Sequence, residues 1–258
     1  MNTYIHLTKS GENPAIRIIT IDRPPRNAMA LDCYRQLLAC LQEINGDQTA
    51  RCVILTGAGE KSFVAGGDLK EHAELDAEAA HLRTALIRQV FNAVRQLRIP
   101  VIAAVNGYAL GGGLALMASC DIVVASDNAT FSLPEVKVGI MGGTSHLKRI
   151  VPEKVVRWMA LTGNMVSADY LHRLGAIQEV VAPGHLMQAA TRIAQDICQH
   201  SPTAIELMKE TLNLTEHMAL DEGYHVECYA TSIMKAAPDG KEAVQAILEK
   251  RPPHFGRA

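Results

Sequence analysis

The chain has 258 residues, of which 48% are hydrophobic and 20% are charged, with a formal net charge of −2. A chain of this length can bury the core of one large domain, and its near-neutral charge argues against a nucleic-acid binder, which would carry a basic patch. No apolar run is long enough to cross a bilayer and the first residues lack the pattern of a signal peptide, so we expect no membrane partner.

Apolar periodicity in residues 1–182 predicts alternating short strands and helices. The expected strands cover residues 3–8, 14–21, 52–56, 62–65, 100–105, 121–125, 130–132 and 178–181. The expected helices cover residues 31–44, 69–97 with a break near Asp76, 113–119, 151–161 and 167–174, the last with Ser167 as its N-cap. Successive strand–strand–helix units suggest a repeating architecture.

The pattern changes after Pro183. Residues 184–199, 202–213, 218–235 and 240–250 all have helical spacing, with no strand between them. We therefore expect an α/β part over residues 1–182 and an all-α part over residues 183–258. Six cysteines are scattered without a Cys-x-x-Cys pair, which favours reduced thiols in a cytoplasmic protein over disulfides or metal ligands.

Two glycine turns stand between a predicted strand and a predicted helix. The first is Gly66-Gly67, followed by Asp68, and the second is Gly111-Gly112-Gly113. Glycines let a ligand approach the main chain, and a helix N-terminus adds partial positive charge. One such turn alone fits tight packing of a strand on a helix. Two of them can each offer a backbone N–H to the same oxygen, as in an oxyanion hole.

Glu135 follows the short strand at 130–132 and precedes a glycine-rich loop at 139–144. A carboxylate among apolar neighbours is a candidate general base, because burial raises its pKa. The same position also fits a solvent-facing or capping glutamate, and spacing alone does not choose between the two interpretations.

Together these segments resemble the enoyl-CoA hydratase/isomerase (crotonase) family over nearly the whole chain. Each match is weakly specific alone, but their order and spacing are very specific. The matching segments are Asp22-Arg23-Pro24 with Asn27-Ala28, residues 63–71, residues 104–113, Cys120-Asp121, residues 131–135 and residues 248–255.

The resemblance implies a spiral of ββα units with a C-terminal helical region that builds trimers or dimers of trimers. It implies an acyl-CoA thioester substrate, whose coenzyme A is part of the substrate, and no separate cofactor or metal. The N–H groups of Gly67 and Gly112 would bind the thioester oxygen as it gains charge. Glu135 matches the catalytic glutamate of the family.

The resemblance also places residues along the CoA path, mostly through their backbone: Ala65, Asp68, Leu69 and Lys70. Arg26 lies in the loop that approaches the CoA phosphates in relatives. Ile247 and Lys250 match C-terminal positions that reach the CoA, in some relatives from a neighbouring chain. His72 is a candidate for the pocket near the thioester. The helical region is thus expected to serve oligomerisation and to cover the CoA pocket.

Two departures from the family pattern bear on the reaction. Hydratases of the family carry a second glutamate two residues after the glycine triplet, where this chain has Ala115. Addition of water needs one group for the water and one for the α-carbon, whereas a single base can shift a double bond. The loop after Glu135 is shorter than usual and lacks the proline of the family, which leaves the acyl specificity open.

The favoured interpretation is an enzyme that passes through a thioester enolate, best labelled enoyl-CoA hydratase/isomerase. Hydration is the common family activity, and isomerisation fits the single glutamate better. Decarboxylation, thioester hydrolysis and a catalytically silent CoA-binding scaffold stay open. RNA binding through a lysine-rich early helix is disfavoured, because residues 31–45 carry only Arg35 as a cation. His72 and His146 are weighed as replacement acids, but the pocket-wall or surface interpretation of each is favoured.

Overall fold

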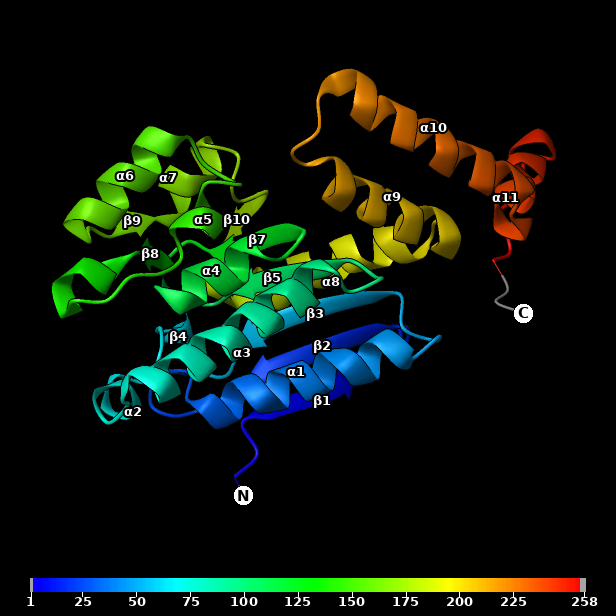
Figure 1. Cartoon of the computed structure of the whole chain (residues 1–258). Helices are drawn as coiled ribbons and strands as arrows, with labels where there is room; N and C mark the ends of the chain where they lie inside the picture. The colour runs from blue at the N-terminus through cyan, green and yellow to red at the C-terminus, as the bar shows by residue number, and fades with distance from the viewer. Residues whose placement is uncertain (1, 256–258) are drawn as a thin grey trace.

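Buried apolar strands form a six-stranded sheet at the centre of the α/β part. The computed structural model describes residues 2–255, and its first sheet has the order β1–β2–β3–β5–β7–β10 (Figure 1). The strands are β1 (Ile5–Lys9), β2 (Ile16–Ile21), β3 (Cys52–Gly57), β5 (Val101–Val105), β7 (Ile122–Ser126) and β10 (Glu179–Val181). Only β1 and β2 are antiparallel; all other neighbours are parallel. Every residue of β3 and β5 is buried, as expected for parallel strands covered on both faces.

A second, four-stranded sheet is formed by strands that follow those of the first sheet in the chain. Its order is β4 (Ser62–Val64), β6 (Tyr108–Leu110), β8 (Thr130–Ser132) and β9 (Val166–Ser167). The first three are parallel, and β9 is antiparallel to β8. The pairs β3–β4, β5–β6 and β7–β8 each put one strand in each sheet, and helices follow each pair. This is the predicted spiral of ββα units.

Helices cover both faces of the first sheet. Alternate strand residues pack on one side against α1 (Leu31–Gly46), α3 (Ala77–Arg95) and α4 (Gly112–Ala118). The other alternate residues, including Ile54 and Ile102, pack against α8 (Leu186–Cys198). The remaining helices of residues 2–198 are α2 (Leu69–Ala73), η1 (Pro134–Val138), α5 (Thr144–Leu147), α6 (Glu153–Thr162), α7 (Ala168–Arg173) and η2 (Pro183–His185).

Two local predictions are confirmed by hydrogen bonds. The break between α2 and α3 falls at Asp76, whose side chain caps α3 by accepting from the N–H of Ala79 at 2.8 Å. Ser167 caps α7 by accepting from the N–H of Tyr170 at 3.2 Å. The elements β6, η1 and α5 were not predicted, because each has five residues or fewer and lies beside a glycine-rich turn.

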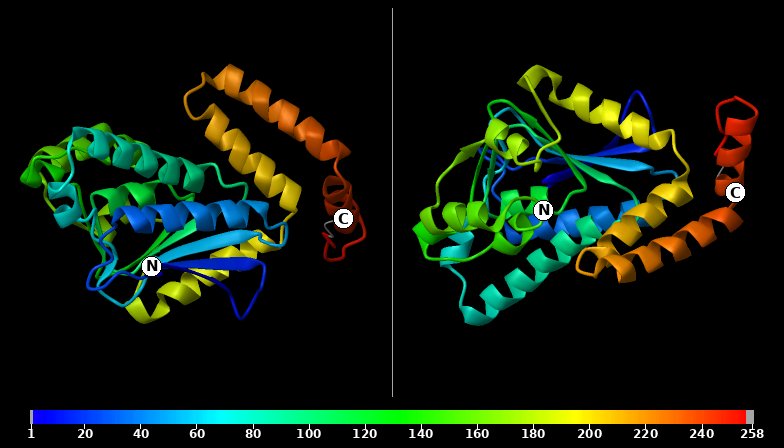
Figure 2. Two further views of the ribbon diagram at one scale, coloured as in Figure 1. Left: turned by 60° about the horizontal axis from the view of Figure 1, so that its bottom comes forward. Right: turned by 90° about the horizontal axis from the view of Figure 1, so that it is seen from above.

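The C-terminal helices project from the α/β body. They are α9 (Pro202–Thr215), α10 (Leu220–Ala236) and α11 (Pro238–Leu248), and Figure 2 shows α10 and α11 reaching away from the sheets. Large apolar side chains are exposed along all three: Met208, Leu212, Leu214, Leu220, Tyr224, Tyr229, Ile233, Val244, Ile247 and Leu248. Within residues 2–255, no helix combines the length and the apolar character needed to cross a membrane.

Lys209 ties α9 to the first sheet. Its side chain is 6% exposed, and its Nζ donates to the Asp121 carboxylate at 2.7 Å and to the carbonyl oxygen of Ile99 at 2.9 Å. The Asp121 carboxylate also accepts from the N–H of Val101, at the start of β5. The helical region is therefore anchored at the strand that leads to the second glycine turn.

Lys209→Met is expected to lower the free energy of unfolding by about 1–2 kcal/mol, because it removes the hydrogen bonds of a buried ammonium group to Asp121 and to the carbonyl oxygen of Ile99. Urea denaturation followed by circular dichroism measures the change. Lys148→Met is the control, since it breaks an ion pair with Glu153 in which both side chains are half exposed, and its midpoint should barely move. Equal midpoints for the two variants would contradict the anchoring role of Lys209.

Candidate active site

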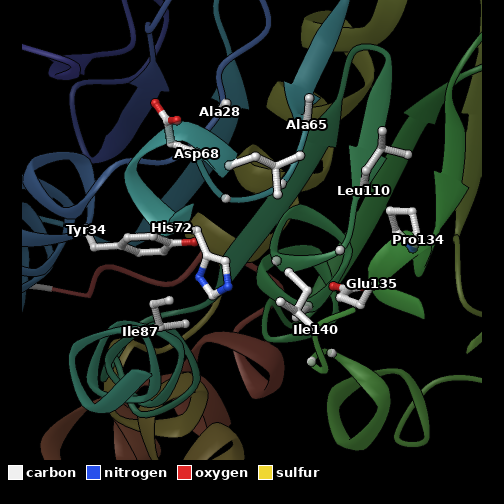
Figure 3. A pocket seen from close by; sticks show the side chains of 18 of the residues that line it. Ala28, Tyr34, Ala65, Asp68, His72, Ile87, Leu110, Pro134, Glu135 and Ile140 are labelled. Carbon is white, nitrogen blue, oxygen red and sulfur yellow. The ribbon is translucent and has the colours of Figure 1, made fainter. Parts of the chain in front are cut away.

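A cavity of about 1200 Å³ lies where β4, β6 and β8 end and their following helices begin. Both glycine turns and Glu135 line it. So do the other predicted residues of the α/β part: Arg26, Ala65, Asp68, Leu69, Lys70, His72, Ala115 and His146. Figure 3 shows His72 and Glu135 projecting into this cavity from opposite sides, with Ile140 beside Glu135.

The two glycine turns meet because β4 and β6 are parallel neighbours, with Val64 paired to Ala109. A Cβ on Gly113 would lie 2.1 Å from the carbonyl oxygen of Val64, so no side chain fits there. A Cβ on Gly66 would lie 3.3 Å from the carbonyl oxygen of Leu110. The missing side chains therefore let the two turns contact each other through their backbones.

The N–H groups of Gly67 and Gly112 have no hydrogen-bond acceptor within residues 2–255, although both glycines line the cavity. Their neighbours are bonded: the N–H of Asp68 donates to Met29 at 3.0 Å and that of Gly111 donates to Ser132 at 2.9 Å. Gly112 is the first residue of α4, where N–H groups have no intrahelical partner. Two donors are thus available at the cavity wall, one from each turn.

Asp68 shapes the first turn through its side chain. Its carboxylate caps α2, accepting from the N–H groups of Lys70 at 2.9 Å and Glu71 at 3.2 Å, and it also pairs with Arg23. Burial alone would raise its pKa, but the bonds from Arg23 and the two N–H groups outweigh burial and hold the pKa below its usual value. Asp68 therefore stays ionised and fixes the start of α2.

Glu135 sits in η1, directly after β8. Its Oε1 lies 2.5 Å from the place that a Cβ on Gly111 would occupy, and Gly111 has the positive φ of 53° that favours glycine. Its Oε2 is buried and has no hydrogen-bond partner within residues 2–255. Burial raises the pKa of the carboxyl. A half-buried carboxylate with one unbonded oxygen beside the second glycine turn is suited to accept a proton.

The position of the second hydratase glutamate is apolar and lies beside the glycine loop. Ala115 is buried at 1% exposure, and a Cβ on Gly143 would lie 3.7 Å from its Cβ. The same point on Gly143 is 2.7 Å from Cδ2 of Leu133. The short loop after Glu135 therefore lies close over Ala115, and Ile140 and Met141 of this loop form part of the cavity wall.

His146 packs edge-on against Phe91, with ring centroids 5.1 Å apart. Burial lowers the pKa of its imidazole, and the nearby cations of Arg149 and Arg95 lower it further. His146 is therefore a neutral wall residue. The other two predicted CoA contacts, Ile247 and Lys250, lie at the end of the projecting α11 and do not line the cavity of their own chain.

Two polar residues beside the glycine turns are absent from the residues predicted for the site. Tyr34 lies on the predicted helix over residues 31–44, and its hydroxyl is 3.2 Å from the place of a Cβ on Gly112. Arg83, on α3, places Nη2 2.6 Å from the place of a Cβ on Gly67. No motif marks either residue. The available signal was that Arg83 lies on the predicted helix over residues 69–97, which also carries the pocket candidate His72.

Known proteins resemble this chain along its length. The family model "Enoyl-CoA hydratase/isomerase" matches residues 11–258. A short-chain-enoyl-CoA hydratase of Clostridium acetobutylicum is 39% identical over 249 residues, covering 95% of this chain and 94% of the relative. A carnitinyl-CoA dehydratase of Salmonella typhimurium is 37% identical over 265 residues, covering 98% of each chain.

Solved structures share the fold. An enoyl-CoA hydratase from Bacillus anthracis has a TM-score of 0.94 and 34% identity, covering 98% of this chain and 99% of its own. Pseudomonas aeruginosa DspI also has a TM-score of 0.94, with 32% identity, covering 99% and 97%. These likenesses agree with the spiral architecture described above.

Proposed function

Because the chain belongs to the enoyl-CoA hydratase/isomerase family, we propose that it binds an acyl-CoA thioester with the thioester oxygen between the N–H groups of Gly67 and Gly112. One observation supports this most strongly: two free N–H groups from adjacent turns line the same cavity as a carboxylate whose Oε2 is buried without a hydrogen bond. Donors fixed in this way stabilise an enolate oxygen more than the neutral carbonyl of the substrate.

Glu135 is the acid/base of the proposed reaction. In a 3-enoyl-CoA, its carboxylate removes a proton from C2, and the electron pair moves into a dienolate whose oxygen is held by the two N–H groups. The protonated carboxyl then returns the proton to C4, and the double bond lies between C2 and C3. Ala115 favours this isomerisation over hydration, because the cavity wall offers no second carboxylate at the family position.

The remaining predicted contacts serve the CoA moiety in this proposal. Arg26 and Lys70 line the cavity as cations for its phosphates. Ile247 and Lys250 would reach the CoA from a neighbouring copy, since they lie outside the cavity of their own chain. The exposed apolar side chains of α9–α11 support a homotrimer or a dimer of trimers. We propose no cofactor beyond the CoA of the substrate, and a cytoplasmic location.

Ultraviolet absorbance of the conjugated thioester tests the proposal. Incubation with 3-hexenoyl-CoA is expected to create this absorbance, whereas the absorbance of crotonyl-CoA should remain largely unchanged. If the absorbance of crotonyl-CoA is lost faster than 3-hexenoyl-CoA gains it, the protein is a hydratase despite Ala115. No change with either substrate, together with measurable CoA binding, would overturn the proposal in favour of a decarboxylase, a thioester hydrolase or a silent scaffold.

The pH profile should carry the signature of Glu135. Burial raises the pKa of this carboxyl, and the base must be ionised to take a proton. The value of kcat/KM should therefore fall as the pH drops, with its acid limb at a higher pH than an ordinary glutamate would give. Initial rates between pH 4 and pH 9 give the apparent pKa of this acid limb. An apparent pKa at or below that of an ordinary glutamate would contradict the assignment of Glu135.

A further inference from the structure

The cavity lining is strongly cationic. Among the described residues its acidic members are Asp68 and Glu135, whereas its basic members are Arg23, Arg26, Lys70, Arg83, Arg88 and Lys137. Arg23 is paired with Asp68, and Arg26 and Lys70 belong to the proposed CoA path. Arg83 is different, because it lies on the α3 wall directly beside the first glycine turn. A hydrocarbon acyl chain gives no reason for a cation at this place.

The geometry of Arg83 leaves one edge of its guanidinium available. The side chain is 11% exposed, and its Nε lies 3.5 Å from a carboxylate oxygen of Glu71. Glu71 is itself held in place, since both of its oxygens accept from the N–H of Leu31, at 2.9 and 3.0 Å. The two Nη groups donate to no acceptor within residues 2–255, and Nη2 is the atom closest to Gly67. Glu71 thus lies on the Nε side of the guanidinium as an ion-pair partner without a hydrogen bond, and the forked end lines the cavity.

Tyr34 adds a second donor beside the other glycine turn. Its ring is buried under the Arg83 guanidinium, with 5.9 Å between the guanidinium carbon and the ring centroid. Its hydroxyl lies 3.2 Å from the place of a Cβ on Gly112 and has no hydrogen-bond partner in the described part of the chain. Burial raises the pKa of this phenol to about 12, so the hydroxyl keeps its proton.

These donors face the cavity and are available to a substrate. A guanidinium fork matches the two oxygens of a carboxylate. We propose that Arg83 and Tyr34 bind a carboxylate on the acyl group, so that the protein prefers CoA monothioesters of dicarboxylic acids. This inference rests on the proposed function, because it assumes that the thioester oxygen lies between Gly67 and Gly112. In this arrangement the acyl chain turns toward α1 and α3, and its carboxylate lies away from Glu135.

Binding of two saturated thioesters separates this inference from the proposed function. Glutaryl-CoA carries the terminal carboxylate, and 5-methylhexanoyl-CoA replaces that carboxylate with an isopropyl group of the same shape. Isothermal titration calorimetry is expected to give at least tenfold tighter binding of glutaryl-CoA. Equal affinities would overturn the inference and leave the proposed function standing, whereas no binding of either thioester would overturn both.

Variants then identify the donors. Arg83→Gln is expected to weaken glutaryl-CoA binding about 10- to 100-fold and to change 5-methylhexanoyl-CoA binding by less than about threefold. Tyr34→Phe should have a smaller effect in the same direction, and Arg83→Lys should recover part of the preference. Arg35→Gln, an exposed arginine of α1 paired with Asp32, is the matched surface control. An equal loss for both thioesters in Arg83→Gln, with native circular dichroism, would overturn the assignment, because Arg83 would then act on the CoA or the thioester oxygen.

Discussion

Glu135→Gln is expected to lower kcat by about two to four powers of ten with every accepted acyl-CoA, because the amide cannot take or return a proton. The substitution keeps the shape of the side chain, and the site is already without hydrogen bonds to Oε2. KM should therefore change little, and the acid limb of the kcat/KM profile should disappear. Steady-state rates with the better of the two test substrates measure the effect.

The matched control for this prediction is Glu153→Gln, which changes an exposed glutamate at the start of α6. It should leave kcat and the pH profile unchanged. A Glu135→Gln enzyme with near-normal kcat would remove this residue from the mechanism and leave the single-base reaction without its base.

Gly112→Pro is expected to lower kcat about 10²- to 10³-fold, since proline removes one of the two N–H donors to the oxyanion. Gly112 is the first residue of α4, a position where proline is well accepted because its N–H has no helical partner. The fold should therefore survive, and circular dichroism and the CoA affinity report on that point. The loss should appear in both kcat and KM, because proline removes the donor and its ring Cδ stands where the N–H faced the substrate oxygen.

Gly112→Ala separates the change at the backbone nitrogen from the added Cβ. Both substitutions place a Cβ about where it would meet the Tyr34 hydroxyl at 3.2 Å, but alanine keeps the N–H. The alanine variant should retain most of its kcat. Equal losses in the two variants would mean that crowding of Tyr34, and not the N–H, explains the effect.

Much of the fold was predictable because the parallel strands are continuous apolar runs. The strands that contain Ile54 and Ile102 are covered on both faces of the sheet, so nearly all of their residues are apolar. Such runs are distinct from exposed loops. The strand β6 was missed because its three residues interrupt a glycine-rich stretch that reads as a turn. Its position matters, since its pairing with β4 brings the two glycine turns into contact.

The candidate site was predictable to the extent that motifs marked it. Gly67, Gly112 and Glu135 are separated by tens of residues in sequence, yet they line one cavity. Tyr34 and Arg83 could not be found in the same way, because their role depends on which helix faces lie over the glycines. Such distances come from packing between elements and leave no local pattern. The sequence therefore predicted the groups that would hold the thioester, but not those that would select the acyl group.

The short loop over Ala115 has a consequence for protein engineering. A glutamate introduced at Ala115 would start from a position that lines the cavity, with the backbone of Gly143 beside it. The glycine loop would therefore limit the rotamers open to the new carboxylate. An engineered second acid at this position would need a redesign of residues 139–143 together with the substitution itself.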